Sequence, residues 1–577
     1  MMNLSYPEIL TLNQKLNLDK KLTPYKISIL SNITINQIKE ILDYSLKLNG
    51  IRSKINIGQY DNIIQEVSKH SQSDLVIIFF ELANLKENFH TKINLVSEKE
   101  LREFTDFFKS TINMILSNLK KTSLVLFNKF SPLIFSSFAL EKNRLEKISE
   151  ELNIYLEKKI DNNVKIIDID KLISNLGINQ SVDMRLFYGA KSLYSIDFYK
   201  SYSEFINPII LSSLGKMKKA LIFDCDNTLW HGILGEDGYK NIKMGDDSYE
   251  GRIFQQIQEK ALELYNKGIF ICLCTKNNYD DVIEVINKHK DMRLKKENFS
   301  VIKSNWKNKV DNIIEIAKEL NVGLDSLVFI DDSDFELEFV KQKLPEVRLF
   351  KVPKDISKYY YLFNKEIQFF YKFNQTQEDK IRNIDFKNQL ERKKLRTKFT
   401  KIEDYLNSLN IKITINLNDK KNLSRISQMT LKTNQFNLTT RRYSEKQIKN
   451  FLANKKYLIF TLSLKDKFGD SGITGLAILK MEKPNNSSVI DTFLLSCRII
   501  GRNVEYAFMN FIISYLKKKN INLVRSNYIR SKKNDQVKNF YEQCSFEIEK
   551  DKKEKKKYSV KINKYKPKLL KYIKINE

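Results

Sequence analysis

The feature that most constrains this chain is a pair of apolar segments that each end on aspartates. "ALIFDCD" (220–226) ends on Asp224 and Asp226, and "LVFIDD" (327–332) ends on Asp331 and Asp332. In an open α/β sheet the side chains at the carboxyl ends of the strands face the ligand crevice. Carboxylates that converge there repel one another unless a hard cation lies among them, and Mg²⁺ prefers such oxygen ligands. The sequence therefore predicts a parallel α/β sheet with a Mg²⁺ site at one edge.

These carboxylates, together with two further side chains, are suited to phosphoryl transfer. Asp224 can attack phosphorus and form an aspartyl-phosphate. Asp226 can protonate the leaving oxygen and later activate water or another acceptor. Thr275, at the end of the apolar segment "ICLCT", and Lys309 can donate to the phosphoryl oxygens. We predict catalytic roles for these four residues.

The four pieces in this order resemble the haloacid-dehalogenase (HAD) superfamily of phosphotransferases. The resemblance implies a Rossmann-like parallel sheet, with Asp224 as nucleophile, Asp226 as acid and base, and Thr275 and Lys309 holding the phosphoryl group. It also implies a Mg²⁺ site built from Asp224, Asp226, Asp331 and Asp332. The alternative is that these side chains are helix caps and turn residues of an inert α/β fold.

The sequence after the first aspartates is more specific. "DCDNTLWHGILGEDG" (224–238) resembles the FkbH-like group of the HAD superfamily (subfamily IIIC), as do "KTNQFNLTTRRY" (432–443), "DKFGDSG" (466–472) and "DTFLLSCRIIGRNVE" (491–505). The resemblance implies transfer of a glyceryl group from 1,3-bisphosphoglycerate to the thiol of an acyl carrier protein. Two departures concern "DDSDFELEFV", which lacks the expected Asn-Pro, and Asn503, which replaces a usual glycine.

The C-terminal part resembles GNAT-type acyltransferases. "RIIGRN" (498–503) lies between an expected strand and a long helix, where backbone N–H groups and the helix dipole can hold a pyrophosphate. The resemblance implies binding of coenzyme A or of phosphopantetheine on a carrier protein. Its loop and partner residues are Arg498, Gly501, Arg502, Asn534 and Tyr541. The alternative is a GNAT-shaped binding module without chemistry of its own.

Two of the five cysteines are candidates to carry an acyl group. Cys225 lies between the catalytic aspartates, and Cys497 directly precedes the expected pantetheine loop. The carboxylates beside Cys225 should raise its pKa and suppress the thiolate. For both cysteines the alternative is an inert thiol in the core.

The N-terminal part alternates strands and helices and resembles the SGNH-hydrolase-like domain that precedes some FkbH-type proteins. Ser31 stands where a nucleophile could lie, but no Gly-Asp precedes it, and His70 and His90 are not in an Asp-x-x-His arrangement. Serine hydrolysis needs a base within reach of the hydroxyl. We expect a degenerate domain that serves docking or substrate positioning.

The predicted fold class is α/β with three domains: SGNH-like α/β, HAD-like parallel sheet and GNAT-like α+β. The expected boundaries are 1–205 for the first domain, 216–375 for the second, 376–400 for an exposed charged helical connector, 401–560 for the third domain and 561–577 for a basic, solvated tail.

Charge and composition limit the classes of partner that this chain is expected to bind. The chain of 577 residues has 99 Lys and Arg against 70 Asp and Glu, a formal charge of +29. No nucleic-acid motif accompanies this charge, so we do not expect nucleic acid as a partner. The resemblance implies an acyl carrier protein and a small phosphorylated metabolite, and an acidic carrier would be attracted by the positive charge. No apolar run is long enough to span a membrane, and the scattered cysteines indicate reduced thiols. We expect a cytoplasmic protein.

Three functions remain open at this point. The first is formation of glyceryl-S-acyl carrier protein for polyketide, other secondary-metabolite or surface-polysaccharide biosynthesis. The second is a phosphatase that acts on a small metabolite such as a sugar phosphate. The third is a non-catalytic scaffold that binds carrier proteins.

Overall fold

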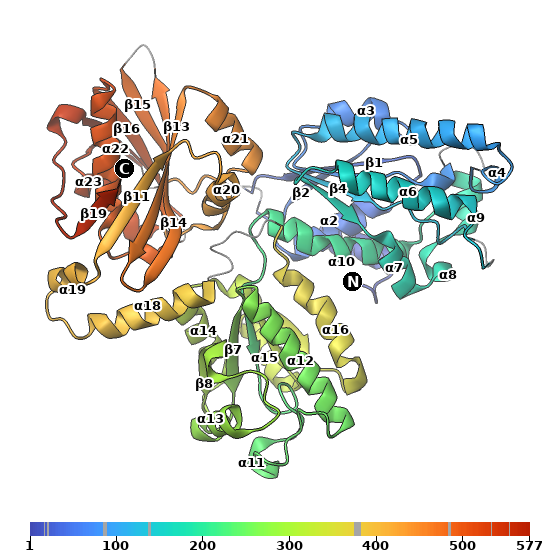
Figure 1. Ribbon diagram of the computed structural model, residues 1–577, viewed down its shortest axis with the longest axis horizontal. Helices are drawn as coiled ribbons and strands as arrows, with labels where there is room; N and C mark the ends of the chain where they lie inside the picture. The colour runs from blue at the N-terminus through green and yellow to red at the C-terminus, as the bar shows by residue number, and fades with distance from the viewer. Residues whose placement is uncertain are drawn as a thin grey trace. The chain divides into compact units, whose positions relative to one another are not determined.

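The alternating segments of the N-terminal part form a five-stranded parallel sheet with helices on both faces (Figure 1). The computed structural model describes residues 1–577 except 17, 20, 21, 85–88, 137–139, 374–381, 483–485, 532, 553 and 577. By its internal contacts the chain divides into two units, Met1–Ile210 and Leu211–Glu577.

The sheet of the first unit has the strand order β2-β1-β3-β4-β5. Strand β3, "LVIIF", is buried along its whole length, as expected for a central strand that is covered on both faces. The strands are β1 (Tyr25–Ser31), β2 (Ser53–Ile57), β3 (Leu75–Phe79), β4 (Leu124–Asn128) and β5 (Val164–Ile167). The helices are α1 (Tyr6–Lys15), α2 (Ile38–Leu48), α3 (Ile63–His70), α4 (Phe89–Lys92), α5 (Glu98–Leu119), α6 (Arg144–Lys159), α7 (Ile169–Leu176), α8 (Ile178–Ser181), α9 (Met184–Ala190) and α10 (Ile196–Ser213).

A second parallel sheet, in the unit Leu211–Glu577, has the order β10-β9-β6-β7-β8. Its central strand β6 is the apolar segment that precedes Asp224. The strands are β6 (Ala220–Phe223), β7 (Phe270–Thr275), β8 (Phe299–Ser304), β9 (Leu327–Asp331) and β10 (Arg348–Lys351). The helices are α11 (Leu234–Asp237), α12 (Tyr249–Asn266), α13 (Tyr279–Lys288), α14 (Lys309–Leu320), α15 (Asp334–Lys343) and α16 (Tyr359–Glu366).

Strand β6 shows why this sheet is buried on both faces. Successive side chains of a strand point to opposite faces. Leu221 and Phe223 pack into a core with α12, α13 and α16, whereas Ala220 and Ile222 pack into another with α14 and α15. The four residues are thus fully buried, and the first polar side chain lies at the end of the strand.

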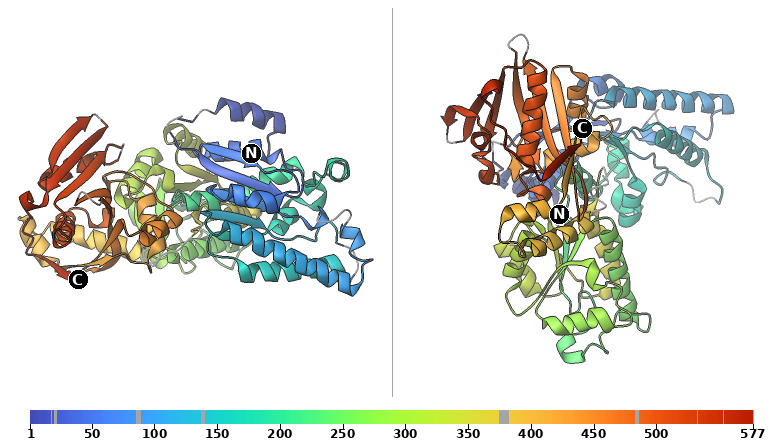
Figure 2. Two further views of the ribbon diagram at one scale, coloured as in Figure 1. Left: turned by 90° about the horizontal axis from the view of Figure 1, so that it is seen from above. Right: turned by 60° about the vertical axis from the view of Figure 1, so that its left-hand side comes forward.

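The C-terminal part forms a mixed, mainly antiparallel sheet of nine strands. Figure 2 shows the long helix α22 beside this twisted sheet. The strands are β11 (Ile411–Leu417), β12 (Phe436–Asn437), β13 (Tyr457–Asp466), β14 (Gly469–Glu482), β15 (Ser487–Leu495), β16 (Leu523–Ile529), β17 (Glu547–Lys552), β18 (Lys555–Lys561) and β19 (Ile573–Asn576). The helices are α18 (Arg382–Arg396), α19 (Ile402–Ser408), α20 (Leu423–Lys432), α21 (Glu445–Ala453), α22 (Val504–Lys518) and α23 (Phe540–Gln543).

The C-terminal basic run differs from the expected solvated tail. Residues 555–561 form β18, and β19 pairs in parallel with β11. Tyr558, Val560 and Ile573 are buried. Between the lysines, apolar residues recur at every second position, as at Tyr558 and Val560. They face the core and hold the segment in the sheet.

The expected exposed connector also differs in part. Residues 376–381 lie outside the described residues, and α18 follows them. Its side chains of Asp385, Phe386 and Arg392 are buried, and Arg392 donates to Asp466 of β13 at 2.9 and 2.7 Å. The helix is therefore packed rather than freely solvated.

The predicted α/β class is confirmed by the two parallel sheets. The predicted division into three domains stays a prediction, since the second and third sheets belong to one unit. None of the helices in the described ranges combines the length and hydrophobicity that a membrane crossing requires.

Candidate active site

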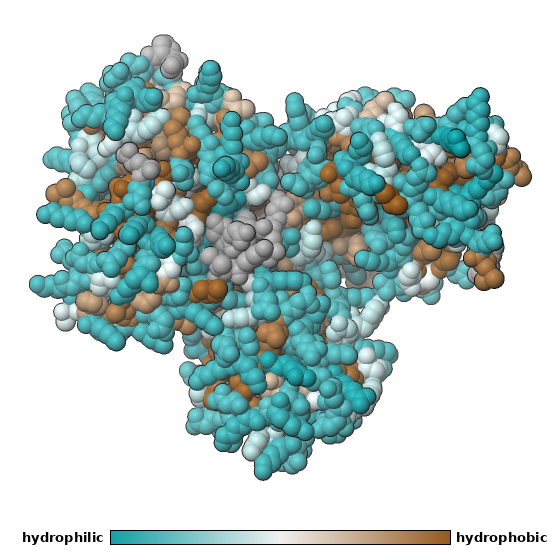
Figure 3. Space-filling model, in the orientation of Figure 1, coloured by the Kyte–Doolittle hydropathy of each residue, from teal (hydrophilic) through white to brown (hydrophobic). Residues whose placement is uncertain are grey.

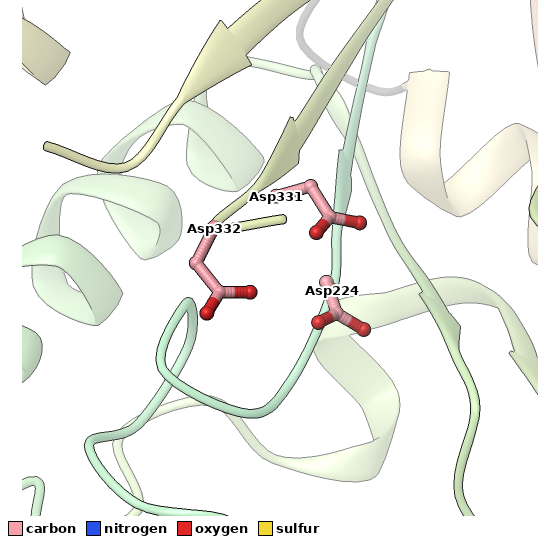
Figure 4. Close-up of side chains that lie close together, drawn as sticks. All are labelled: Asp224, Asp331 and Asp332. Atoms are coloured by element: carbon pink, nitrogen blue, oxygen red, sulfur yellow. The ribbon is translucent and has the colours of Figure 1, made fainter. Parts of the chain in front are cut away.

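Asp224 and the pair Asp331–Asp332 meet at the carboxyl edge of the second sheet (Figure 4). Strands β6 and β9 pair in parallel, with Phe223 opposite Ile330, so the residues that follow them lie side by side. One carboxylate oxygen from each of the three aspartates lies within 4.8 Å of the other two. The strand order reverses between β6 and β9, which is where open α/β sheets bind their ligands.

Lys309 is the buried cation of this cluster. It is the first residue of α14, and its Nζ lies 3.1 Å from Asp224 Oδ1 and 2.6 Å from Asp331 Oδ2. Burial lowers the pKa of Lys309, but the two carboxylates raise it further, so the net pKa is raised. The ammonium therefore remains charged and can hold a phosphoryl oxygen beside Asp224.

Asp224 is nearly inaccessible, with 6% of its surface exposed. Burial raises its pKa to about 6, and the neighbouring Asp331 also raises it, whereas Lys309 and the Thr275 hydroxyl lower it. Thr275 ends β7 and is 1% exposed. The structure thus brings Asp224, Thr275 and Lys309 together, as predicted.

Asp226 is held by three donors. Its Oδ1 accepts hydrogen bonds from Trp230 Nε1 and from the Leu234 N–H, both at 3.0 Å, and its Oδ2 accepts from Asn277 Nδ2 at 2.9 Å. Asn277 Nδ2 also lies 3.0 Å from Thr275 Oγ1 and donates to it. These contacts fix the orientation of Asp226 next to the cluster.

Asp226 is not among the three aspartates whose carboxylate oxygens lie within 4.8 Å of one another, and its role as a metal ligand stays a prediction. The loop that follows β6 sets its orientation. Asn227 adopts a left-handed conformation (φ 50°), and its Oδ1 accepts from the Gly232 N–H at 3.0 Å. The turn directs Asp226 toward Trp230 and Asn277.

The three converging carboxylates suit a divalent cation. Asp331 already accepts hydrogen bonds from Lys309 through Oδ2 and from the Ser333 N–H through Oδ1 (2.9 Å). Asp332 is exposed, and its pKa is raised by burial of part of the group and by Asp224. Hard cations such as Mg²⁺ bind one or two carboxylates and keep several waters. Asp224 and Asp332 fit that requirement, with Asp331 positioning Lys309.

Two residues of this site were missed by reasoning from the sequence. Asn277 follows Thr275 by two positions, and the polar run "TKNN" at the end of a buried strand was the available signal. Trp230 belongs to the quoted motif, but its spacing from Asp226 gave no reason to assign a contact. Both act on Asp226 through hydrogen bonds.

The two candidate thiols lie in different surroundings. Cys225 is fully buried, and burial, Asp224 and Asp226 all raise its pKa well above the ordinary value. Cys497 is exposed, but it lines a cavity together with Lys219, which directly precedes β6. Asp224 follows the carboxyl end of β6, whereas Lys219 and Cys497 lie toward its amino end. The four residues of the strand span roughly 13 Å.

The expected pantetheine residues have structural partners. Arg498 forms an ion pair with Asp385, and Arg502 donates to Asp466 at 2.9 Å. Asn534 is fully buried, and its amide group bonds to the backbone of Asn437, Ile529 and Ser531. Tyr541 is 1% exposed, and Gly501 adopts a positive φ of 82° before α22. A role in pantetheine binding stays a prediction for these five residues.

The split between β15 and β16 is where the third sheet could open to a ligand. The two strands pair in parallel only from Ser487–Leu523 to Ile490–Ser526. Beyond that point β12 pairs with β15, and the Ile529 N–H donates to Leu438 O at 2.8 Å. The segment around β12 therefore occupies the backbone edge that an extended arm would need.

Among the described residues of the N-terminal unit, the candidate Ser31 is not placed as a nucleophile. Ser31 is 4% exposed, and its Oγ donates to Ile33 O (2.8 Å) and accepts from Ile33 N (3.0 Å). His70 instead lies 2.9 Å from Ser28 Oγ and 3.2 Å from Glu66 Oε2, and the His90 ring packs at a tilt against Phe135. Ser28 is fully buried within β1, so that Ser-His-Glu set cannot meet a substrate.

Comparisons with known proteins find a phosphatase domain in the part of the chain that forms the second sheet. Residues 219–368 match the family model of NLI interacting factor-like phosphatases. A crystal structure of the N-terminal part of the protein BF1531 from Bacteroides fragilis, which contains a phosphatase domain and is complexed with Mg, is 25% identical to this chain. It superposes with a TM-score of 0.55 and covers 64% of this chain and 100% of its own. A search of curated proteins found no match.

Acetyltransferases match the chain more weakly. The ribosomal-protein-S18-alanine N-acetyltransferase of Escherichia coli is 14% identical over 26% of this chain and 94% of its own, with a TM-score of 0.22. The PaiA N-acetyltransferase of Thermoplasma acidophilum, complexed with coenzyme A, is 20% identical over 21% of this chain and 72% of its own, with a TM-score of 0.18. At these TM-scores the likenesses assign neither ligand nor activity to the third sheet.

The family match and the carboxylate cluster coincide in one place. Asp224, Thr275, Lys309, Asp331 and Asp332 all lie within the matched residues 219–368. The chain therefore carries an HAD-like phosphatase domain and is an enzyme.

Proposed function

We propose that this chain is a Mg²⁺-dependent phosphotransferase that removes phosphate from a small phosphorylated metabolite through Asp224. The observation that carries the proposal is the contact of buried Lys309 with both Asp224 and Asp331, at the point where three carboxylates converge. Such a cluster costs free energy unless it binds a cation and an anionic substrate.

The residues present divide the reaction between them. An oxygen of Asp224 attacks phosphorus as the bond to the leaving oxygen breaks, and Asp226 gives that oxygen a proton. Water then attacks the aspartyl-phosphate while Asp226 takes its proton, and phosphate leaves. Lys309 and Thr275 hold the phosphoryl oxygens throughout. Mg²⁺, held by Asp224 and Asp332, would neutralise charge on the transferred group.

We further propose, as the finer candidate, that the thiol of an acyl carrier protein attacks the acyl carbon of 1,3-bisphosphoglycerate while the acyl phosphate leaves as inorganic phosphate. Asp224 removes the second phosphate by the steps above, so that the carrier holds a glyceryl group. The motifs "DCDNTLWHGILGEDG" and "DTFLLSCRIIGRNVE" support this candidate. Since Cys225 is buried and Cys497 lies toward the other end of β6, the acyl group would pass directly to the carrier thiol rather than through an enzyme cysteine.

Plain hydrolysis is the competing function. It is favoured by the pairing of β12 with β15, which fills the gap between β15 and β16. A carrier arm would have to displace the segment around β12, whereas water needs no such opening. Binding of a carrier protein without any catalysis would leave the cluster at Asp224 without a purpose.

Intact-protein mass spectrometry separates these functions. A phosphopantetheinylated carrier is incubated with the enzyme, Mg²⁺ and 1,3-bisphosphoglycerate. A glyceryl mass increment that is absent with Asp224→Asn supports transfer. Phosphate release with an unmodified carrier supports hydrolysis, and no phosphate release from any phosphorylated metabolite would contradict both.

A further inference from the structure

Exposed aromatic side chains of the phosphatase domain gather at the carboxyl edge of its sheet. Tyr279, Trp306 and Phe335 come shortly after the ends of β7, β8 and β9, and they are 45%, 71% and 74% exposed. The connections at the opposite edge expose no large apolar side chain in this way. These connections are residues 267–269, 289–298, 321–326 and 344–347, all of which the structure describes. The exposed rings therefore lie on the side of the sheet that carries Asp224.

Trp306 is held in place although it is the exposed tryptophan of the chain. Its Nε1 donates a hydrogen bond to Asn278 Oδ1 at 3.0 Å. The residue before it is tied to the neighbouring strand, since the Asn305 N–H donates to Thr275 O at 3.2 Å. An aromatic ring that is fixed before binding loses little conformational freedom when a ligand packs against it. Trp306 is thus suited to bind a ligand at this edge.

The two loops that fix Trp306 also carry the catalytic side chains. The loop after β8 leads into Lys309, the first residue of α14. The loop after β7 carries Asn277, which donates to Asp226 Oδ2 at 2.9 Å, and then Asn278, which accepts from Trp306. A general acid must lie within hydrogen-bond reach of the leaving oxygen. The organic part of the substrate, which is bonded to that oxygen, therefore lies beside the loop that Trp306 contacts.

We propose that Trp306 is a specificity-determining residue that packs against a ring in the organic part of the substrate. The inference rests on the proposed removal of phosphate through Asp224. An indole presents a large apolar face that attracts other rings. The substrate class is therefore a phosphate ester that bears a ring. This class agrees with plain hydrolysis rather than with transfer from 1,3-bisphosphoglycerate, which is acyclic and highly charged.

The tryptophan fluorescence of the protein gives a direct readout of this contact. The chain has two tryptophans, and Trp230 is fully buried whereas Trp306 is exposed. Acrylamide should therefore quench mainly Trp306. Two phosphonates, which the enzyme cannot hydrolyse, serve as probes with the full-length protein and Mg²⁺. Benzylphosphonate bears a ring, and methylphosphonate is the matched probe without one.

Saturating benzylphosphonate should lower acrylamide quenching to the level seen in Trp306→Phe, where only the buried Trp230 remains. Methylphosphonate should leave the quenching unchanged. In Lys309→Met the protection by benzylphosphonate should be lost, because the anchor of the phosphonate group is removed. Cyclohexylmethylphosphonate distinguishes the source of the ring, since its protection shows that a saturated ring, as in a sugar, is accepted as well as a planar one.

Kinetics with two phosphate donors separate binding of the ring from chemistry. Trp306→Ala should raise KM for phenyl phosphate about tenfold and keep kcat within about twofold, whereas both constants for acetyl phosphate, which has no ring, should stay unchanged. Trp306→Phe keeps a ring and should retain most of the affinity. Phe107→Ala removes an exposed ring of α5 in the first unit and is the matched control. Circular dichroism checks that each variant is folded, and Trp306→Leu replaces an unfolded Trp306→Ala.

Several outcomes would overturn the inference. They are equal protection by benzylphosphonate and methylphosphonate, no protection by millimolar benzylphosphonate in the folded parent, and undiminished protection in Lys309→Met. Equal losses with phenyl phosphate and acetyl phosphate in Trp306→Ala would assign Trp306 a structural role instead. If the parent releases no phosphate from either donor, the proposed function fails and the quenching result still decides this inference. If Asp224→Asn abolishes release from both donors but Trp306→Ala behaves as the parent, only this inference fails.

Discussion

The two parallel sheets of this chain are built alike but differ at the ends of their strands. In sequence order the first sheet runs 2-1-3-4-5 and the second 3-2-1-4-5, and both place a reversal of strand order between two central strands. At that point the second sheet carries Asp224 and Asp331, and the first carries Ser31 and Glu81. The fold alone therefore does not make a catalytic centre.

The difference lies in charge balance. Lys309 contacts both Asp224 and Asp331 in the second sheet. In the first sheet Glu81 is buried, one of its oxygens lacks a hydrogen-bond partner, and its pKa is raised to about 7 by burial. A lone buried carboxyl tends to become neutral, whereas a carboxyl paired with an ammonium stays available for chemistry.

Replacing Asp224 tests the comparison most severely. Asp224→Asn should lower phosphate release by about a thousandfold or more, because the amide cannot form the aspartyl-phosphate. Ser31→Ala is the matched change in the first sheet and should leave the rate unchanged. Steady-state phosphate release measures both, and retained turnover in Asp224→Asn would refute the nucleophile.

Removing Lys309 should have the next largest effect. Lys309→Met leaves Asp224 and Asp331 facing each other without a cation, so we expect a loss of about a hundredfold to a thousandfold in kcat. The loss should persist at saturating Mg²⁺. Rates within about twofold of the parent enzyme would show that Lys309 is only a structural partner of Asp331.

Metal removal and replacement of Asp332 test the proposed Mg²⁺ site. Chelation should abolish phosphate release, and added Mg²⁺ should restore it. In Asp332→Asn, restoration should need at least about tenfold more Mg²⁺, since a charged oxygen ligand is lost. An unchanged Mg²⁺ requirement in this variant, or full activity in the presence of chelator, would remove the proposed metal site.

The pH dependence of stability tests the first sheet. The folded-state pKa of Glu81 lies above its unfolded value, so its contribution is full below about pH 4.5 and is lost as the pH rises to about 7. The loss is about 3 kcal/mol. Glu81→Gln should therefore stabilise the first unit at pH 8 but not at pH 4.

Urea unfolding at the two pH values, followed by hydrogen exchange of the β3 amides, measures this difference. Glu66→Gln is the matched control, because Glu66 is paired with Lys69 at 2.8 Å. Equal stabilisation by Glu81→Gln at both pH values would show that Glu81 is already neutral or solvated in the folded protein.

The basic side chains of this chain lie both on the surface and in the interior. The face of the molecule in Figure 3 is mostly hydrophilic, with apolar residues in small groups. The formal charge of the chain is +29, and part of it lies in the interior, since Lys309 is 4% exposed.

The sequence by itself determined the strands and the chemistry at their ends. Apolar segments that stop at Asp224, Thr275 and Asp331 predicted a parallel sheet and a phosphoryl site, because hydrophobic periodicity and strand ends are local properties. Ser31 without a nearby base was likewise predicted to be inert, and the structure places neither His70 nor His90 beside it.

Only the tertiary structure decided which of these side chains touch. Trp230 and Asn277 donate to Asp226, which precedes a left-handed Asn227, and no sequence pattern predicted these contacts. The packing of the loop 496–498 places Cys497 in a cavity with Lys219, and its role as an acyl thiol stays a prediction. Contacts between residues far apart in sequence depend on packing and backbone turns, which a local pattern does not encode.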